Sequence, residues 1–196
     1  MPSEIEKTVC RHTRRIIAGK SNTNTYFNED KSKHVDITTS TYVIYKDTAI
    51  HTTIGFFNTD IGLYDNSNRS IRIELICVSD KEDDIAPKVM ATVAFEIMDS
   101  ESPKCDYGRI YKNVITAYDE SYEMKHIILL APVFWNHTSR KHTSLEAKDM
   151  VVKWLMLFPI SDQEKEYIEN HGVQEFEKLL EKQKTDVTNR KRKSFL

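Results

Sequence analysis

Three histidines, His126, His137 and His142, are the side chains whose type and spacing could most readily do chemistry in this sequence. Neutral imidazoles bind zinc when they converge with a carboxylate or a thiolate. The chain has no HExxH or CxxC motif, and the spacing of His137 and His142 suits a metal only if the local backbone folds back on itself. We therefore predict surface histidines and no metal site, and we keep a hydrolase that uses these histidines as the weakest of three functional hypotheses.

A nucleophile for covalent catalysis is not indicated either. Ser144 or Cys105 could be paired with a histidine on paper, but neither lies in a G-x-S-x-G turn that would expose it to an oxyanion hole. With only 5 glycines in 196 residues, a phosphate-binding loop is hard to place. The sequence thus predicts a protein that is not an enzyme and needs no cofactor.

Cysteine use and the N-terminus indicate a compartment. Cys10, Cys77 and Cys105 are odd in number and far apart, which argues against a disulfide framework. No apolar leader follows Met1, and no apolar run approaches the roughly 20 residues that a membrane-spanning helix needs. We expect a protein of the reducing cytoplasm that does not bind membranes.

The charge balance argues against nucleic acid as a direct partner, because 28 basic and 30 acidic residues give a net charge of -2. The basic run of Arg190, Lys191, Arg192 and Lys193 is interpreted as part of a solvated, flexible tail at residues 185–196. Seven acidic residues mark the solvent side of two C-terminal helices, although an acidic surface would also suit a basic partner such as a nuclease. They are Asp162, Glu164, Glu166, Glu169, Glu175, Glu177 and Glu181.

Glu74 is an acidic residue within an otherwise apolar strand pattern. If it is buried, its carboxyl group needs a partner, and Arg72 or a basic residue of another strand is the expected one. A charged spot at a partner interface is one interpretation. The exposed face of a half-covered sheet is the interpretation that we favour.

Hydrophobic periodicity predicts strands grouped before and after a central helix. A first helix spans residues 4–18, a polar turn-rich segment spans 20–30, and strands follow at 35–39, 42–45 and 51–57. The clearest strand, 71–77, should be covered on both faces toward its end. A helix capped by Asp84 leads to strands at 107–115, 126–131 and 151–158, with a polar loop at 136–145. This order predicts one α+β domain, residues 1–196, with helices packed on a mixed or mainly antiparallel sheet.

A C-terminal helix pair is the best-marked feature of the chain. Pro159 is expected to end the preceding strand, and Ser161 with Glu164 forms a capping box at the first helix. Gly172 is expected to end that helix near residue 170. The second helix places Val173, Phe176, Leu179 and Leu180 on one face.

This C-terminal pattern resembles the suppressor-of-fused family. The shared features are a strand that ends in a Leu-Pro-Ile type of turn, a Glu-x-Glu helix, a glycine, a second helix and a final Arg–Ser segment. Here they are Phe158-Pro159-Ile160, Glu164 with Glu166, Gly172, and Arg190 with Ser194. Weaker similarities lie upstream at residues 51–55, 73–75, 107–110 and 126–132. Phe158 departs from the more usual Leu or Val, and the neighbouring basic residues leave open whether Arg190 is the matching arginine.

The resemblance covers most of the chain, from about residue 51 to 194, and it is to the small single-domain bacterial members. It implies a non-enzymatic α+β domain without a cofactor. It also implies an immunity protein or antitoxin that neutralises a toxin in a bacterial toxin system. A scaffold or regulator that sequesters a transcription or signalling protein is the alternative. The residues that bind the partner are unknown at this point, and a homodimer is left open.

Overall fold

One mixed sheet with helices on both of its faces forms the body of the protein. The computed structural model describes residues 3–16, 19–41, 47–99, 105–132, 144–186 and 189–196. The helices are α1 (Glu4–Ile16), α2 (Ala86–Asp99), α3 (Asp162–His171) and α4 (Val173–Gln183), with a one-turn 3-10 helix, η1 (Phe56–Asn58). The strands are β1 (Ser21–Phe27), β2 (His34–Thr41), β3 (Thr48–Ile54), β4 (Leu63–Tyr64), β5 (Ser70–Asp80), β6 (Ile110–Tyr111), β7 (His126–Leu130), β8 (Ser144–Glu146) and β9 (Met150–Ile160).

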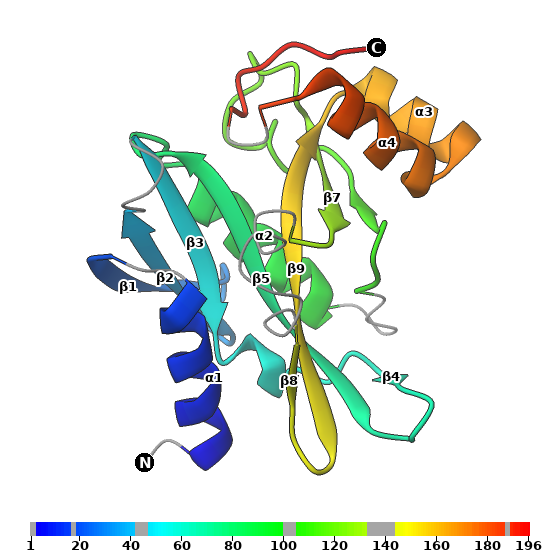
Figure 1. Cartoon of the computed structure of the whole chain (residues 1–196). Coiled ribbons are helices and arrows are strands. Elements are labelled where there is room, and N and C mark those ends of the chain that lie inside the picture. Colours follow the sequence, from blue (N-terminus) through cyan, green and yellow to red (C-terminus); the bar gives the residue numbers. More distant parts are fainter. Residues whose placement is uncertain (1–2, 17–18, 42–46, 100–104, 133–143, 187–188) are drawn as a thin grey trace.

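The sheet has the order β1-β2-β3-β5-β9-β7-β6, with β4 also paired to β5 and β8 to β9 (Figure 1). Strands β5 and β9 run parallel, and the other described pairs are antiparallel. The predicted α+β class, the mainly antiparallel sheet and the C-terminal helix pair are therefore confirmed. No helix among the described residues is long and apolar enough to cross a membrane.

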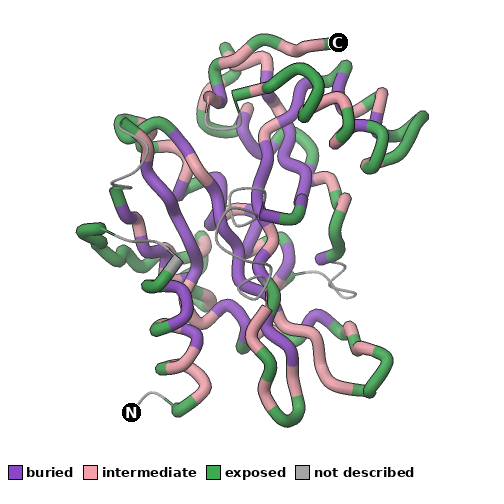
Figure 2. The backbone as a smooth tube through the Cα atoms, viewed as in Figure 1, coloured by how far each residue is buried: buried purple, intermediate pink, exposed green. Residues whose placement is uncertain are grey.

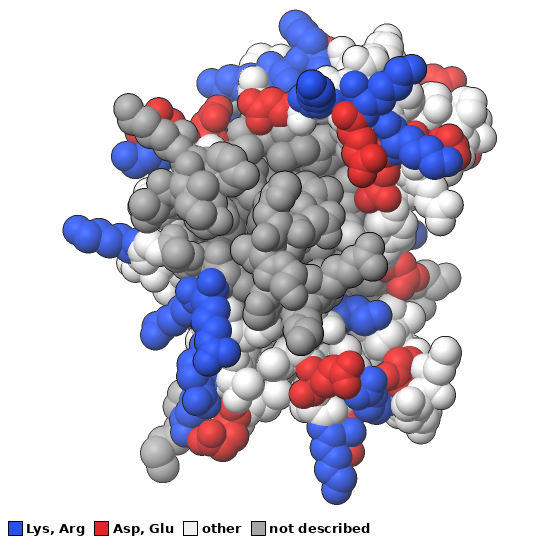
Figure 3. All heavy atoms as spheres, viewed as in Figure 1, with Lys and Arg blue, Asp and Glu red and all other residues white. Residues whose placement is uncertain are grey.

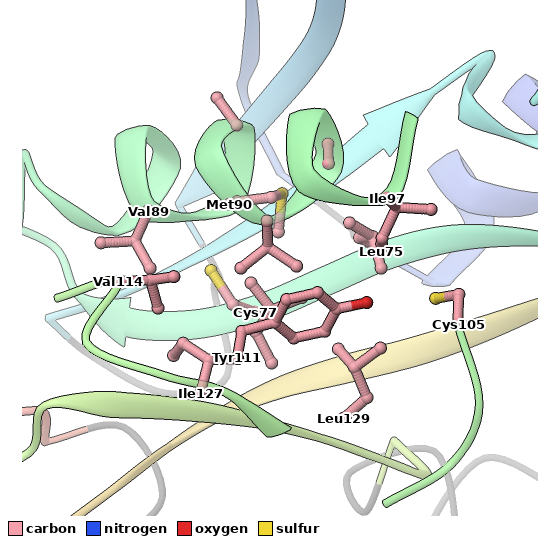
Figure 4. Packing of buried hydrophobic residues seen from close by; sticks show 14 of the residues in the cluster. Leu75, Cys77, Val89, Met90, Ile97, Cys105, Tyr111, Val114, Ile127 and Leu129 are labelled. Atoms are coloured by element: carbon pink, nitrogen blue, oxygen red, sulfur yellow. The ribbon is translucent and has the colours of Figure 1, made fainter. Parts of the chain in front are cut away.

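Hydrophobic clusters cover both faces of the central strands. Buried residues follow one another along these strands (Figure 2). On one face, α2 packs Val89 and Ile97 over Leu75 and Cys77 of β5 (Figure 4). On the other face, a second cluster joins residues of β5 and β9 to one residue each from α1 and α4. It includes Ile76, Trp154, Phe158, Val9 and Phe176. The expected coverage of both faces of β5 is thus confirmed, and the sheet is a central layer.

The strand β1 lies where the sequence predicted a turn-rich segment. Its side chains are nearly all exposed, so it lacks the apolar alternation that marks a half-buried strand. It forms because all of its residues pair with β2. The strand predicted at 51–57 is also corrected: β3 ends at Ile54, and Gly55, with φ of 86°, turns the chain into η1.

Two further strand boundaries were wrong. The strand predicted at 107–115 is reduced to β6, with turns on either side. Pro159 lies inside β9, opposite Ile127, and does not end the strand. The Leu129 N–H and C=O groups bond to Arg109 and Gly108, on the side of β7 away from β9, and Ile127 faces the same way because bonded positions alternate. The N–H that Pro159 lacks therefore belongs to the side of β9 that forms no ladder bond with β7. The Pro159 carbonyl oxygen accepts a hydrogen bond from Arg192 at 2.9 Å. The strand predicted at 42–45 lies outside the described residues, as does most of the loop predicted at 136–145.

Asp83, and not Asp84, caps α2. The Asp83 carboxylate accepts hydrogen bonds from the backbone N–H groups of Ile85 (2.9 Å) and Ala86 (3.0 Å). Asp84 instead pairs with the Lys88 side chain at 3.1 Å. The sequence offered two adjacent aspartates, and their local pattern alone could not decide which one turns toward the helix.

The C-terminal segment is packed onto the domain through two arginines. Arg192 places its guanidinium on the fully buried carboxylate of Glu164, with N–O distances of 2.5 and 2.7 Å. Arg190 pairs with Asp83 at 2.7 Å, and both of these side chains are about as buried as Arg192. The interpretation of the basic run as a solvated tail was therefore wrong for these arginines, whereas Lys191 and Lys193 are exposed.

The same Glu164 carboxylate completes the predicted capping box. The Ser161 hydroxyl accepts from the Glu164 N–H, and the Glu164 carboxylate accepts from the Ser161 N–H, both at 3.1 Å. Glu164 thus joins the start of α3 to the C-terminal segment. It is buried, so its assignment to the solvent side of the helix pair was wrong, and the other six acidic residues are exposed or partly exposed.

We predict that Arg192→Met destabilises the protein by about 3–5 kcal/mol, because it leaves the Glu164 carboxylate buried without its cation. The matched control is Lys193→Met, whose side chain is 88% exposed and which should change the free energy of unfolding by less than about 0.5 kcal/mol. Urea unfolding followed by circular dichroism measures both. Equal midpoints for the two variants would show that the buried pair contributes nothing to stability.

Candidate functional site

The predicted chemical residues do not form a catalytic site among the described residues. His126 is 2% exposed, so its assignment as a surface histidine was wrong. Its Nδ1 accepts the Asn113 N–H at 2.9 Å, and its Nε2 lies 2.9 Å from the Asp162 carboxylate, so both ring nitrogens are engaged. His137 and His142 lie outside the described residues. Within the described part of the chain, no three His, Cys, Asp or Glu side chains are placed to hold a metal ion.

The two candidate nucleophiles also have structural positions. Ser144 begins β8 and pairs with Lys153 of β9. Cys105 is buried in the cluster beneath α2, close to Tyr111 and Leu129 (Figure 4). Burial raises the pKa of the Cys105 thiol to about 12, which keeps it protonated and poorly nucleophilic near neutral pH.

Glu74 is a fully buried carboxyl group in the middle of β5. It accepts hydrogen bonds from the N–H of Gly55 at 2.9 Å, from the N–H of Phe57 at 3.4 Å and from the hydroxyl of Thr53. The exposed interpretation that we favoured was wrong, and so was the expected partner. Arg72 instead lies 3.5 Å from Asp60. The Glu74 carboxyl group therefore fixes the turn from β3 into η1.

The environment of Glu74 favours its neutral form. Loss of hydration outweighs the hydrogen bonds that Glu74 accepts, and burial raises the pKa of this carboxyl group to about 8. Burial shifts the pKa of His51 in the opposite direction, to about 4, because the protonated form of histidine is the charged one. Its ring nitrogens lie 2.8 Å from the Thr39 hydroxyl and 3.0 Å from the Ser79 hydroxyl.

A hollow of about 480 Å³ opens where the Glu74-held turn meets the first half of α1. Its polar lining comes from α1, β2 and η1, and its apolar lining includes Val35, Phe56 and Met98. The polar lining consists of Glu6, Cys10, His34, Asp36 and Asn58. We call this feature the α1 groove. Sequence patterns do not indicate this groove, because its residues come from four separate stretches of the chain.

The carboxylates of the α1 groove are already engaged. Glu6 accepts the Ser3 N–H at 2.6 Å and the Asn58 amide at 3.2 Å, and the bond from the Ser3 backbone is the main cause that lowers its pKa. Asp36 accepts the Thr25 hydroxyl at 2.6 Å. The groove therefore offers further acceptor sites on these carboxylates, together with the Cys10 thiol.

A row of basic side chains runs along the outer side of α1, beside the groove, and is visible in Figure 3. It consists of Lys7, Arg11, Arg14 and Arg15, and we call it the α1 basic stripe. Lys7 and Arg11 share the Glu4 carboxylate at 2.6 and 3.9 Å. Arg14 and Arg15 have no carboxylate partner among the described residues. The α1 groove and this stripe form the best candidate for a partner-binding face, and such a face can bind without chemistry.

Comparisons with known proteins give the family and the fold. The family described as "Suppressor of fused protein (SUFU)" matches residues 31–193. The immunity protein YqcF of Bacillus subtilis (strain 168) is 31% identical over 190 residues, which cover 97% of this chain and 96% of YqcF.

Two solved structures share the fold. A putative SUFU homologue from Neisseria gonorrhoeae FA 1090 has a TM-score of 0.73 at 14% identity, with 97% of this chain and 96% of that one covered. The corresponding chain of the Sufu–Fu complex has a TM-score of 0.59 at 10% identity, with 96% and 90% covered.

We predict that Glu74→Gln changes how stability depends on pH. The folded pKa of about 8 lies above the ordinary value of 4.5, so the folded chain holds this proton more tightly than the unfolded chain does. The stability that Glu74 contributes is therefore fully present below about pH 4.5 and is lost as the pH rises toward 8. Glu74→Gln, which stays neutral, should gain more than about 2 kcal/mol relative to the unsubstituted protein between pH 5 and pH 8.

The measurement is urea unfolding at a series of pH values, with the exposed Glu166→Gln as the control. The free energy of unfolding of each variant is compared with that of the parent at the same pH. This difference removes the contribution of His51 to stability, which becomes more favourable as the pH rises from about 4. A difference that stays constant with pH for Glu74→Gln would show that Glu74 is ionised in the folded protein.

Proposed function

The chain belongs to the suppressor of fused family, and from this premise we propose that it acts as a bacterial immunity protein that binds a toxin and neutralises it. The observation that carries the proposal is the 31% identity with an immunity protein over nearly the full length of both chains. A match of that extent leaves little of either chain outside the comparison. The proposed role is binding, and it requires no catalytic step.

The surface of the described residues is compatible with this role. The α1 groove provides a concave site, and the α1 basic stripe provides positive charge next to it. A specific interface of about 1,600 Å² can block an active surface by occlusion alone. Charge complementarity would speed the capture of a partner with an acidic contact surface. We infer that the toxin docks on this face of α1.

The cytoplasm is the proposed place of action. Cys77 and Cys105 are free and buried, and Cys10 is free and partly buried. Free thiols are typical of a reducing compartment. A toxin made in the same cell, or delivered into it, would meet the immunity protein there.

A second candidate function is the sequestration of a regulator. The observation that favours it is the shared fold with a chain of the Sufu–Fu complex, which is a solved protein–protein assembly. At 10% identity this likeness shows the fold alone. A pull-down from the native organism that returned a transcription or signalling protein, and no toxin, would favour this function over immunity.

The test of the immunity proposal is co-expression with a candidate toxin whose reading frame lies beside the gene. Cells that express the toxin alone should die, and cells that express both proteins should survive. The purified proteins should elute together from a sizing column. Cell death with both proteins present, together with separate elution, would contradict the proposal.

We predict that Arg14→Glu/Arg15→Glu slows association with the toxin about tenfold or more and reduces protection, because it reverses the charge of the α1 basic stripe. The control is Lys178→Glu/Lys182→Glu on α4, which makes the same change in net charge far from α1. It should leave the association rate and the protection unchanged. Surface plasmon resonance at two salt concentrations measures the rates. Equal rates for the two double variants would place the toxin on another face and leave the immunity function itself standing.

A further inference from the structure

Strand β1 is an open edge of the sheet. It pairs with β2 on one side, and the order of the strands places no described strand on its other side (Figure 1). Six of its seven residues are exposed, and Phe27 keeps 57% of its surface in solvent. An edge of this kind presents a row of unpaired backbone groups that another strand can bind.

The register shows which backbone groups face outward. Lys20 and Asn28 bond across to β2 and its preceding turn, because the Thr41 N–H donates to the Lys20 carbonyl and the Asn28 N–H donates to the Lys33 carbonyl. In an antiparallel pair the bonded positions alternate along the strand. Even-numbered residues of β1 therefore bond to β2, and the N–H and C=O groups of Ser21, Thr23, Thr25 and Phe27 point away from it.

The edge lacks the usual features that prevent pairing. Natural edge strands are protected by charged side chains, proline, bulges or short length. The sequence of β1, Ser-Asn-Thr-Asn-Thr-Tyr-Phe, has no charge and no proline, and its pairing with β2 is continuous over seven residues without a bulge. Thr, Tyr and Phe also favour strands. A long, regular and neutral edge is suited to a partner strand.

We propose that the β1 edge binds the β1 edge of a second copy of this chain, antiparallel about a two-fold axis at Asn24. Asn24 is the midpoint of the strand, so this register overlaps all seven residues. It pairs Thr23 with Thr25 of the second copy and Ser21 with Phe27 of the second copy. Every outward N–H and C=O group of the strand then has a partner, and two β1–β2–β3 sheets join into one.

The side chains at the ends of β1 fit this self-pairing better than they fit a parallel arrangement. The strand is preceded by the exposed Lys20 and followed by the exposed Glu29 and Asp30. Antiparallel pairing brings the basic end of one copy to the acidic end of the other, at both ends of the interface.

The expected dimer is reversible. Pairing through one seven-residue edge buries less surface than the roughly 1,600 Å² of a standard stable interface. We therefore expect monomers at low protein concentration and dimers at high concentration. The proposal is independent of the proposed function, since it needs no toxin.

Sedimentation velocity of the full chain, from about 1 to about 300 µM, tests the proposal directly. The weight-average sedimentation coefficient should rise with concentration from monomer to dimer. Thr25→Pro removes one outward N–H while leaving the pairing with β2 intact, and it should weaken dimerisation at least about tenfold. Thr25→Val is the matched control, because it also loses the hydroxyl bond to Asp36 but keeps the N–H, and it should dimerise like the parent.

A cysteine cross-link tests the register. At a non-hydrogen-bonded antiparallel pair the Cα atoms lie about 4.5 Å apart, within the range that a disulfide spans. Asn24→Cys should therefore form a covalent dimer under mild oxidation, whereas Asn22→Cys, which the two-fold axis places opposite Tyr26, should not. The parent chain, which has three thiols of its own, measures how much covalent dimer forms without the introduced cysteine.

Two results would overturn the proposal. One is a parent chain that stays monomeric over the whole concentration range, which would leave a strand of another protein as the occupant of the edge. The other is dimerisation that Thr25→Pro leaves unchanged, which would place the dimer interface elsewhere. Thermal unfolding of each variant at low concentration checks that the domain is folded in every comparison.

Discussion

Strand β5 lies between two hydrophobic clusters, so each side chain along its central part must find an apolar neighbour or a hydrogen-bond partner. Glu74 is the side chain for which this constraint is most demanding. Its carboxyl group satisfies the N–H groups of the turn that follows β3, and that turn forms one wall of the α1 groove. A surface feature thereby depends on a contact in the middle of the sheet.

Two buried carboxylates beside the C-terminal segment also have the partners that burial requires. Glu164 and Asp83 each lie at the start of a helix, where their carboxylates accept backbone N–H groups, and each also receives an arginine from the C-terminal segment. A capping carboxylate that is also paired leaves little of its charge uncompensated. The last residues of the chain therefore belong to the folded domain, and removing them would leave both carboxylates without their cations.

The sequence was sufficient where one local signal acts alone. The capping box at Ser161 and the strand β5 each come from a signal within a single segment, and each was predicted correctly. The errors have a common physical origin in contacts between distant segments. The partner of Glu74, the burial of Arg192 and the pairing of β1 depend on residues that are far apart in sequence, and no periodicity within one segment encodes them. The α1 groove was missed for the same reason.

The stretches that carry the family resemblance are largely internal. Thr53 and Gly55 meet Glu74, and Ser161 meets Ser194, at hydrogen bonds inside the domain. These contacts explain why family membership fixes the fold. The family match begins at residue 31, whereas α1 ends at Ile16 and β1 ends at Phe27. The α1 basic stripe and the β1 edge thus lie in the segment before that match, where exposed side chains can change which protein is bound without disturbing the buried network that holds the sheet together. The α1 groove differs, because most of its lining lies inside the match.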